Sequence, residues 1–314
     1  MSKVSIIVPV YNTANKLEKC LESLVNQTMQ DIEIVIVNDG STDNSEKIIM
    51  EYQDKYPNII KYYKKENTGV SDTRNYGLNV AKSEYIMYID SDDYIDIHTL
   101  EKLNKYIENG IEVIKFKLQK VDERGKIIGR FDGPVFEKTT GEEAFEKLYG
   151  EDVMLVSPCV YIIKKEIFTR NKFEFIGKYH EDFGLIPFII ITAKSIVSTP
   201  YYLYNYVQGK ESITRTADYK KIVERAEQTL FQYDQMIKKV ENIKLSKRAI
   251  ENIKIYFTNA TILKANELKK KDRKEYLKQI KKRKMYKNIK SRNMKQLIKR
   301  MILKTSTSLY LKMR

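Results

Sequence analysis

Short apolar runs alternate with amphipathic segments through the first third of this chain of 314 residues. The apolar runs are typical of buried strands, and the segments between them repeat their apolar side chains at helical spacing. This alternation predicts a mostly parallel sheet covered by helices, because parallel neighbours are joined by a crossover that is usually a helix. The expected strands are residues 5–11, 33–37, 60–63 and 85–89, and the expected helices are residues 15–27, 71–81, 97–108 and a segment around residues 48–52.

The pattern is mixed after residue 112 and helical from about residue 218. We therefore expect one α/β domain over residues 1–215 and a helical region over residues 216–314. No Pro/Gly-rich linker divides the chain into smaller units. The later elements of the first domain are expected to be strands at residues 113–121, 126–131, 160–163 and 196–206 and helices at residues 140–148 and 181–193.

The composition is that of a packed globular protein. Apolar residues make up 42% of the chain, with 23 Tyr and 11 Phe, which excludes a disordered chain. Two Cys and two His leave no disulfide framework and no zinc spacing. The apolar stretch at residues 183–191 contains Pro187 and is shorter than the roughly 18 residues of a membrane span. With no signal-peptide pattern at the amino terminus, we expect a cytoplasmic protein.

The net charge of +15 is distributed very unevenly. Residues 263–314 contain 20 Lys or Arg and three acidic residues, a charge of +17, so the first 262 residues carry 15 − 17 = −2. Within this basic tail, apolar residues recur at three- and four-residue steps between cations: Met294, Leu297, Ile298, Met301 and Ile302. Such an amphipathic basic helix is typical of segments that lie in a membrane interface. The alternative is a helix that packs on the main domain.

An acidic cluster follows the strand expected at residues 85–89. Asp90 and Asp92 are two residues apart, so on an extended chain they share a face. Hard cations such as Mg²⁺ prefer carboxylate and phosphate oxygens. The cluster therefore indicates a metal–diphosphate site. The alternative is that Ser91 to Asp93 cap the helix that follows.

Polar and aromatic residues also follow the other three strands. Tyr11 follows the first strand, Asp39 the second, and Asn67, Gly69 and Arg74 come after the third. Ligands of open parallel sheets bind at the carboxyl ends of the strands. An aromatic ring, a carboxylate, an arginine and a metal-binding acid together describe a nucleoside diphosphate site. Taken singly, each is also compatible with an edge aromatic, a turn residue or a surface charge.

Four segments carry a resemblance to a known family. The segments SIIVPVYN (5–12), EIVIVNDGSTD (33–43), ENTGVSDTRNYGL (66–78) and YIMYIDSDDYI (85–95) resemble those of the family 2 inverting glycosyltransferases with the GT-A fold, of the bacterial cell-surface polysaccharide type. The resemblance covers the first 95 residues and continues loosely to about residue 215. It implies a Rossmann-like, mostly parallel sheet flanked by helices, followed here by a helical C-terminal extension.

The resemblance implies roles for the strand-end residues. Tyr11 would stack on a uracil-type base, Asp39 would accept its ring N–H, and Arg74 would help to hold the nucleotide. Asp90 and Asp92 would form a DXD motif that binds Mn²⁺ or Mg²⁺, with Asp92 the more direct ligand. The nucleotide-sugar site would also include Pro9, Asn67, Gly69 and Ser91.

The family also places a catalytic base at the start of a later helix. Here the Glu181-Asp182 pair stands directly before an apolar helix. We expect Asp182 to be the base and Glu181 to orient the base or the acceptor, with His180 a neighbour. The alternative is that the two acids only stabilise the helix N-terminus. Further on, the family's post-catalytic loop is matched weakly by a segment whose expected lid residues are Lys210, Ser212 and Arg215.

These features predict a metal-dependent transferase. It would move one sugar from a nucleotide diphosphate donor, a UDP-sugar, to a hydroxyl of a glycan or lipid-linked acceptor. The chain has no Trp, so the Gln-x-x-Arg-Trp motif of processive synthases is absent and single addition is expected. The basic tail predicts peripheral attachment to an anionic membrane, at the inner face of the plasma membrane.

Two other functions are compatible with parts of the sequence. The basic tail raises the possibility of a nucleic-acid-binding protein, but its aromatics are few and the main domain is nearly neutral, so no nucleic-acid partner is expected. A catalytically inactive scaffold of the same fold is disfavoured, because every expected carboxylate is present.

Overall fold

The computed structural model describes residues 2–149, 156–209, 218–289, 301–302 and 304–305. In this part of the chain, ten strands form one sheet in the order β3-β2-β1-β4-β9-β6-β10-β5, with β7 paired to β6 and β8 paired to β10. The strands are β1 Val4–Val10, β2 Ile32–Asn38, β3 Ile60–Lys64, β4 Tyr85–Tyr88, β5 Tyr94–Ile95, β6 Val113–Val121, β7 Ile127–Phe131, β8 Phe136–Thr139, β9 Tyr161–Lys164 and β10 Ile196–Val207.

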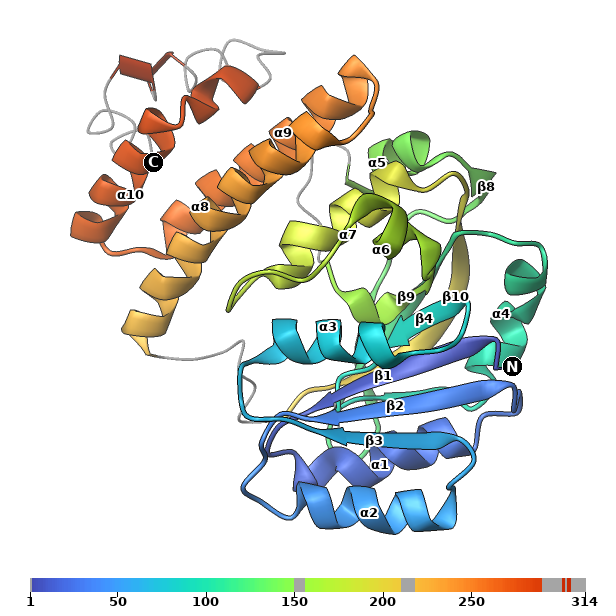
Figure 1. The fold of residues 1–314 in the computed structure, drawn as a ribbon. Coiled ribbons are helices and arrows are strands. Elements are labelled where there is room, and N and C mark those ends of the chain that lie inside the picture. Colours follow the sequence, from blue (N-terminus) through green and yellow to red (C-terminus); the bar gives the residue numbers. More distant parts are fainter. Residues whose placement is uncertain (1, 150–155, 210–217, 290–300, 303, 306–314) are drawn as a thin grey trace.

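Helices cover both faces of the sheet. Figure 1 shows α3 over one face of β1–β3, and α1 and α2 over the other. The α-helices are α1 Ala14–Val25, α2 Ser45–Lys55, α3 Val70–Val80, α4 Thr99–Glu108, α5 Gly141–Tyr149, α6 Glu166–Asn171, α7 Glu181–Thr192, α8 Tyr219–Asn242, α9 Lys247–Lys264 and α10 Lys270–Lys282. Short 3₁₀ turns are η1 Pro158–Val160, η3 Ala265–Glu267 and η4 Met285–Asn288.

The predicted mostly parallel sheet is confirmed. Strands β3, β2, β1 and β4 are all parallel, and β10 is parallel to β6, while β9 runs antiparallel between β4 and β6. Every residue of β1 and of β2 is buried, as expected for parallel strands with helices on both faces. The predicted apolar stripe of α1 is likewise buried and consists of Leu17, Cys20, Leu21 and Leu24.

Three short elements were not predicted: β5, β8 and α6. Strand β5 has two residues, and α6 has six, fewer than the two turns over which helical spacing becomes visible. Strand β8 pairs with β10 and has no buried residue. A strand without a buried face carries no alternation of apolar and polar side chains, so its sequence resembles that of a loop.

The C-terminal helices pack against α5 and α7. The ring of Phe183 in α7 lies 4.4 Å from that of Phe257 in α9, centroid to centroid, and Tyr149 in α5 lies 4.8 Å from Tyr256. These residues belong to one hydrophobic core that also contains the sheet. The boundary predicted at residues 215/216 therefore separates segments that share a core, and the division into two domains stays a prediction.

A glycine allows α8 to approach α7 closely. A Cβ on Gly184 would lie 1.9 Å from the side-chain oxygen of Gln232 in α8. Gln232 is buried and donates to the carbonyl oxygen of Ile176 at 2.6 Å. Helix α8 is thus fixed to both α7 and the loop that precedes it.

The first half of the predicted basic tail is packed. Leu277 and Ile280 of α10 and Met285 of η4 are fully buried. Arg283 forms a bidentate ion pair with Asp234 of α8, with both N···O distances 2.8 Å. Residues 263–289 thus contribute to the packing of the C-terminal helices, whereas both the membrane helix predicted around residues 294–302 and its packed alternative stay predictions. Of the predicted membrane helix, Met294, Leu297 and Ile298 lie outside the described residues.

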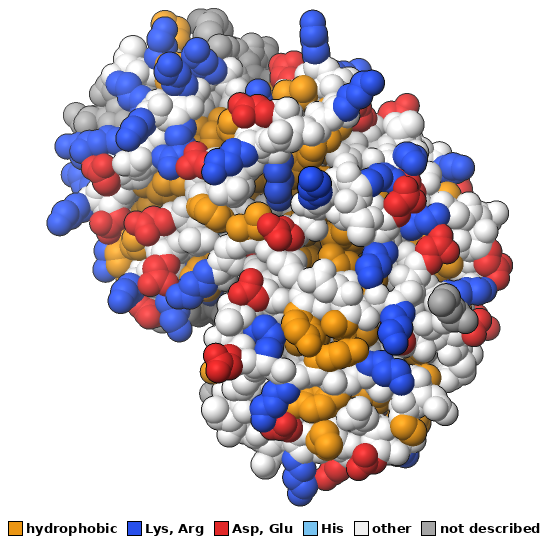
Figure 2. Space-filling model, in the orientation of Figure 1, with side chains coloured by type: hydrophobic (Ala, Val, Ile, Leu, Met, Phe, Trp, Pro, Cys, Tyr) orange, Lys and Arg blue, Asp and Glu red, His pale blue; other side chains and the backbone are white. Residues whose placement is uncertain are grey.

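Lys and Arg side chains gather over the C-terminal helices, as the space-filling view shows (Figure 2). Among the described residues, no helix combines the length and apolarity that a membrane crossing requires.

Candidate active site

Four strand ends meet at one edge of the sheet, because β1–β4 run parallel. Pro9 is buried inside β1, and Tyr11 follows it and is 49% exposed. Asp39 follows β2 and is almost fully buried. Loop 65–69 follows β3, and the acidic turn, which we define as residues 90–93, follows β4. The structure therefore brings together the strand-end residues that the sequence singled out.

The carboxylate of Asp39 holds the loop after β3. It accepts hydrogen bonds from the backbone N–H groups of Thr68 and Gly69, each at 3.0 Å, and pairs with the ammonium of Lys65. Gly69 directly precedes α3 with a φ of 96°, a conformation that glycine adopts without a steric penalty. Asn67, two residues earlier, is exposed. A carboxylate has about four acceptor positions. Within the described part of the chain three of them are occupied, which leaves one for a further N–H donor.

The loop after β1 connects the neighbouring strand ends. The Asn12 side-chain oxygen accepts from the backbone N–H groups of Thr42 and Asp43, at 2.8 and 3.3 Å. The Thr13 hydroxyl donates to the buried Ser91 hydroxyl at 2.9 Å. These bonds fix the acidic turn relative to the turn after β2. Asn12 and Thr13 were not predicted as site residues. The possible signal was Asn12 itself, because Asn is among the residues that best tolerate the φ of 51° found there.

Arg74 joins the acidic turn to the start of α7. Its side chain is buried, with Nη2 donating to Asp90 at 2.9 Å and Nη1 donating to Glu181 at 2.5 Å. Burial opposes the charge, but the carboxylates of Asp90 and Glu181 raise the pKa of Arg74, so the guanidinium stays ionised. Its Nε has no hydrogen-bond partner among the described residues. Arg74, expected to hold the nucleotide, thus bridges two carboxylates from different parts of the sequence.

The remaining acids of the turn have different environments. Burial and the neighbouring charge of Asp90 raise the pKa of Asp92, and Lys16, 3.7 Å away, opposes that shift. Asp93 is buried and accepts hydrogen bonds from the Tyr204 hydroxyl at 2.6 Å and the Val207 N–H at 2.7 Å. Asp92 is thus half-buried near a second carboxylate, whereas Asp93 fastens β10 to the turn.

The capping alternative for the acidic turn is wrong. Helix α4 begins at Thr99, and the carboxylate before it is Asp96, which accepts from the His98 N–H at 3.0 Å. The acids of the turn therefore do not cap α4.

The acidic turn fits a divalent cation that shares its coordination shell with a ligand. Burial and the charge of Asp90 raise the Asp92 pKa, and a nearby cation would oppose both effects. The described residues contain no group of three His, Cys, Asp or Glu able to hold a metal. Mg²⁺ commonly uses one or two carboxylates together with phosphate oxygens, and Asp90 and Asp92 match that pattern.

The two acids at the start of α7 are held differently. Glu181 is tied to Arg74, whereas Asp182 has one hydrogen bond, from the Phe183 N–H at 2.6 Å, and no ion pair among the described contacts. Burial and the charge of Glu181 raise the pKa of Asp182 to about 7. Asp182 can therefore exchange a proton near neutral pH, which is what a general base requires.

His180 precedes α7 in a left-handed conformation, with φ of 59°. Burial and the positive charges of Lys264 and Arg225 lower its pKa to about 4. The imidazole is consequently neutral at neutral pH, and its buried Nε2 has no hydrogen-bond partner in the described part of the chain.

Two tyrosines that were not predicted as site residues have pKa values that Asp182 helps to raise. Burial and the charge of Asp182 raise the pKa of Tyr256 in α9, and burial, nearby tyrosines and Asp182 do the same for Tyr149 in α5. The Tyr256 hydroxyl is buried without a hydrogen-bond partner among the described residues. No signal at residues 149 or 256 indicated this, because both lie far in sequence from Asp182.

The expected lid residues Lys210, Ser212 and Arg215 lie outside the described residues. Their predicted role stays a prediction.

The chain resembles several known proteins. Residues 5–171 match the model of the family described as Glycosyl transferase family 2. The chain is 31% identical, over 68% of its length, to glycosyltransferase GlyA of Streptococcus pneumoniae. It is 33% identical, over 68% of its length, to the minor teichoic acid biosynthesis protein GgaB of Bacillus subtilis. The alignments cover 32% of GlyA and 24% of GgaB, so the chain spans about a third or less of these relatives.

A solved structure supports the fold assignment. S. aureus TarS 1-349 in complex with UDP-GlcNAc matches with a TM-score of 0.75 at 19% identity, covering 99% of this chain and 88% of that chain. The predicted GT-A fold is confirmed. Since the family model matches more than half of its residues, the chain belongs to glycosyl transferase family 2.

Proposed function

We propose that the chain is an inverting glycosyltransferase that moves one sugar from a UDP-sugar to a hydroxyl of a glycan or lipid-linked acceptor in cell-surface polysaccharide synthesis. The observation that carries this proposal is the Arg74 bridge, which holds Asp90 of the acidic turn beside Glu181, the neighbour of Asp182. Arg74 would thereby connect the edge proposed to bind the diphosphate with the proposed proton acceptor. The family, the part of GgaB in minor teichoic acid biosynthesis and the UDP-GlcNAc complex of TarS are in keeping with it.

The donor would lie along the strand ends. Tyr11 is exposed and would stack on the base, and the free acceptor position of Asp39 would take its ring N–H. Pro9, Asn67, Gly69 and Ser91 would line the nucleotide sugar. Asp92 and Asp90 would hold Mn²⁺ or Mg²⁺, which when bound neutralises charge on the diphosphate.

Asp182 would act on the acceptor. Its carboxylate takes the proton of the acceptor hydroxyl while that oxygen forms a bond to the anomeric carbon of the donor sugar. The bond from that carbon to the diphosphate oxygen breaks, and UDP leaves with the electron pair. Attack from the side opposite the diphosphate inverts the anomeric centre. Glu181, fixed by Arg74, would keep the start of α7 in place.

Release of UDP from a panel of nucleotide sugars tests this proposal. We expect one or a few donors to give UDP in the presence of acceptor, and NMR of the product to show the opposite anomeric configuration. Donor binding without release would indicate an inactive scaffold. Binding of nucleic acid without binding of any nucleotide sugar would favour the nucleic-acid function.

We also propose that the basic residues near the C-terminus attach the chain to an anionic membrane surface. Residues 290–314 contain eight Lys or Arg and no Asp or Glu. Each cation near an anionic membrane contributes about 1 kcal/mol. A chain that ends at residue 289 keeps the buried Leu277, Ile280 and Met285, whereas a cut after residue 262 would remove part of the core.

We expect the chain that ends at residue 289 to lose sedimentation with phosphatidylserine vesicles and to retain UDP release with a soluble acceptor. Raising the salt concentration should weaken vesicle binding of the full chain, because salt screens exposed charges. Neutral phosphatidylcholine vesicles serve as the control. A full chain that ignores anionic vesicles at low salt would disprove the attachment.

A further inference from the structure

A second cavity lies away from the strand ends, between the C-terminal ends of α7 and α8. We call it the α7–α8 cavity; its volume is about 870 Å³. Six of its lining residues are Lys or Arg, and one, Glu142, is acidic. Both carboxylate oxygens of Glu142 accept hydrogen bonds from Ser246, at 2.9 and 2.6 Å. The lining is therefore strongly cationic.

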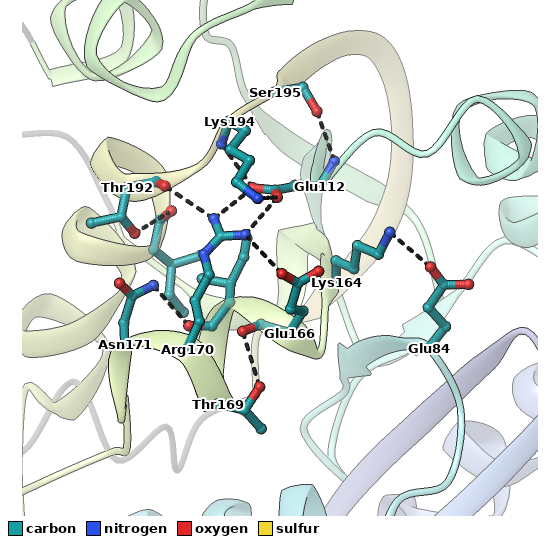
Figure 3. Close-up of polar contacts among 12 residues, drawn as sticks. Glu84, Glu112, Lys164, Glu166, Thr169, Arg170, Asn171, Thr192, Lys194 and Ser195 are labelled. Atoms are coloured by element: carbon teal, nitrogen blue, oxygen red, sulfur yellow. Dashed lines mark hydrogen bonds and ion pairs between the residues drawn. The ribbon is translucent and has the colours of Figure 1, made fainter.

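One wall is a rigid ionic network, shown in Figure 3. Arg170 donates to both carboxylate oxygens of Glu112, at 2.6 and 2.7 Å, and to the Thr192 carbonyl oxygen at 3.1 Å. The Lys194 N–H donates to Glu112 at 2.7 Å, and its ammonium lies 4.0 Å from that carboxylate. The carboxylate of Glu166 lies 3.8 Å from the Arg170 guanidinium. Glu112 and Glu166 together balance the charges of Arg170 and Lys194, so these two cations shape the wall and add little free charge.

Four other lysines of the cavity form no ion pair among the described residues, although the charge of Glu174 acts on Lys239. Lys172, Lys238 and Lys244 are exposed and come from the end of α6, from α8 and from the turn after α8. Lys239 is half-buried, and burial lowers its pKa to about 8. Its ammonium donates to the carbonyl oxygen of Gly184 at 3.0 Å. All four ammonium groups belong to residues that line one cavity, and a bound anion would be attracted to them.

The rest of the lining favours an organic chain over a single small ion. Phe173, Ile191 and Leu245 present apolar surface, and Asn171 and Asn242 present amides. Sugar or polyol units offer apolar C–H faces to the first group and hydroxyls to the second. A cavity of about 870 Å³ also has the volume typical of sites for organic ligands.

We infer that the α7–α8 cavity binds a segment of an anionic glycan or polyol chain that carries phosphate or carboxylate groups. This inference rests on the proposed function, because such a segment would be part of the acceptor. Asp182 and Thr192 are ten residues apart on α7, which separates them by about 15 Å along the helix axis. The cavity would hold units remote from the reacting hydroxyl, whose binding energy helps to orient the acceptor.

The test compares two triple variants of the full chain. Lys172→Gln/Lys238→Gln/Lys244→Gln removes three exposed charges of the cavity, and Lys47→Gln/Lys82→Gln/Lys274→Gln removes three exposed charges elsewhere. Binding of fluorescent poly(glycerol phosphate) and oligogalacturonate oligomers is measured by anisotropy over a range of salt concentrations. Neutral dextran is the uncharged control. No nucleotide sugar is present, so the result does not depend on transfer.

We expect the cavity variant to bind at least about tenfold more weakly, and the slope of log affinity against log salt to fall by roughly two, because three cation contacts are lost. The control variant should bind like the unaltered chain. Tighter binding of the phosphate or of the carboxylate oligomer would show which anionic group the cavity recognises.

Equal binding by both variants, or equal binding of dextran, would overturn the inference. UDP release from donor and water reports the donor site separately and should be the same in both variants. Oligomer binding through the cavity without any sugar transfer would leave the inference standing and remove the proposed transferase function.

Discussion

Replacing Asp182 by Asn is expected to lower the turnover of sugar transfer by roughly 10²–10⁴-fold, the scale of general-base loss, with donor affinity little changed. The amide keeps the size of the side chain but cannot take the acceptor proton. Asp182 makes no ion pair among the described contacts, so few structural bonds are lost. Turnover and donor affinity are measured separately, by UDP release at saturating substrates and by calorimetry.

The pH profile provides an independent check. Because burial and Glu181 raise the pKa of Asp182 to about 7, activity should fall as the pH drops below about 7. Arg74 and Asp90 also face Asp182, with opposite effects on its pKa. The folded chain retains the Asp182 proton up to higher pH than the unfolded chain, whose carboxyl titrates near 3.8. The Asp182 contribution to stability therefore declines as the pH rises from about 4 to about 7.

Two controls accompany this variant. Asp182→Asn should be at least as stable as the unaltered chain above pH 7, because it carries no buried charge. Glu181→Gln breaks the ion pair with Arg74 and should lower the thermal midpoint. If Asp182→Asn stays active while Glu181→Gln is inactive, Glu181 is the base. If both stay active, the base lies elsewhere.

Asp92→Asn is expected to reduce turnover by roughly 10²-fold or more, since charge stabilisation by a metal is worth several kcal/mol. A neutral amide is a poorer ligand for a hard cation and leaves the diphosphate charge less compensated. EDTA should abolish UDP release by the unaltered chain, and added Mn²⁺ or Mg²⁺ should restore it. The variant should need a higher metal concentration for half-maximal activity.

Asp93→Asn is the matched control, because Asp93 belongs to the same turn but binds the Tyr204 hydroxyl and the Val207 N–H. It should lower stability without changing the metal concentration required. Full activity of the unaltered chain in EDTA would show that Asp90 and Asp92 do not bind a catalytic metal.

The sequence predicted well the features that depend on local pattern. Strands β1, β2 and β4 are rich in apolar residues, and parallel strands bring their carboxyl ends to one edge. Tyr11, Asp39 and the acidic turn could therefore be assigned to one site without coordinates. The helix α7 was visible because residues 183–191 are apolar and follow two acids.

Contacts between distant segments were not predictable. The sequence showed Arg74 and Glu181 as separate charges, although they are 2.5 Å apart in the structure. The same holds for Tyr256 near Asp182 and for Arg170 with Glu112. The spacing of side chains in the sequence predicts which residues share a face of one helix or strand. These partners instead come from different elements that tertiary packing brings together. The helical character of α10 was predicted, but its packing was not, because its many lysines concealed the buried Leu277 and Ile280.

The packing of α9 on α7 has a consequence for the order in which the protein matures during translation. The strands β1–β4 and the acidic turn leave the ribosome early, followed by the helix that carries Asp182. Phe183 of that helix finds its aromatic partner, 4.4 Å away, only when Phe257 has been synthesised. We expect a nascent chain to form the strand ends proposed to bind the nucleotide first. The start of α7, which carries the proposed base Asp182, would reach its final packing later. A ribosome-bound intermediate would then capture donor before it is able to transfer sugar.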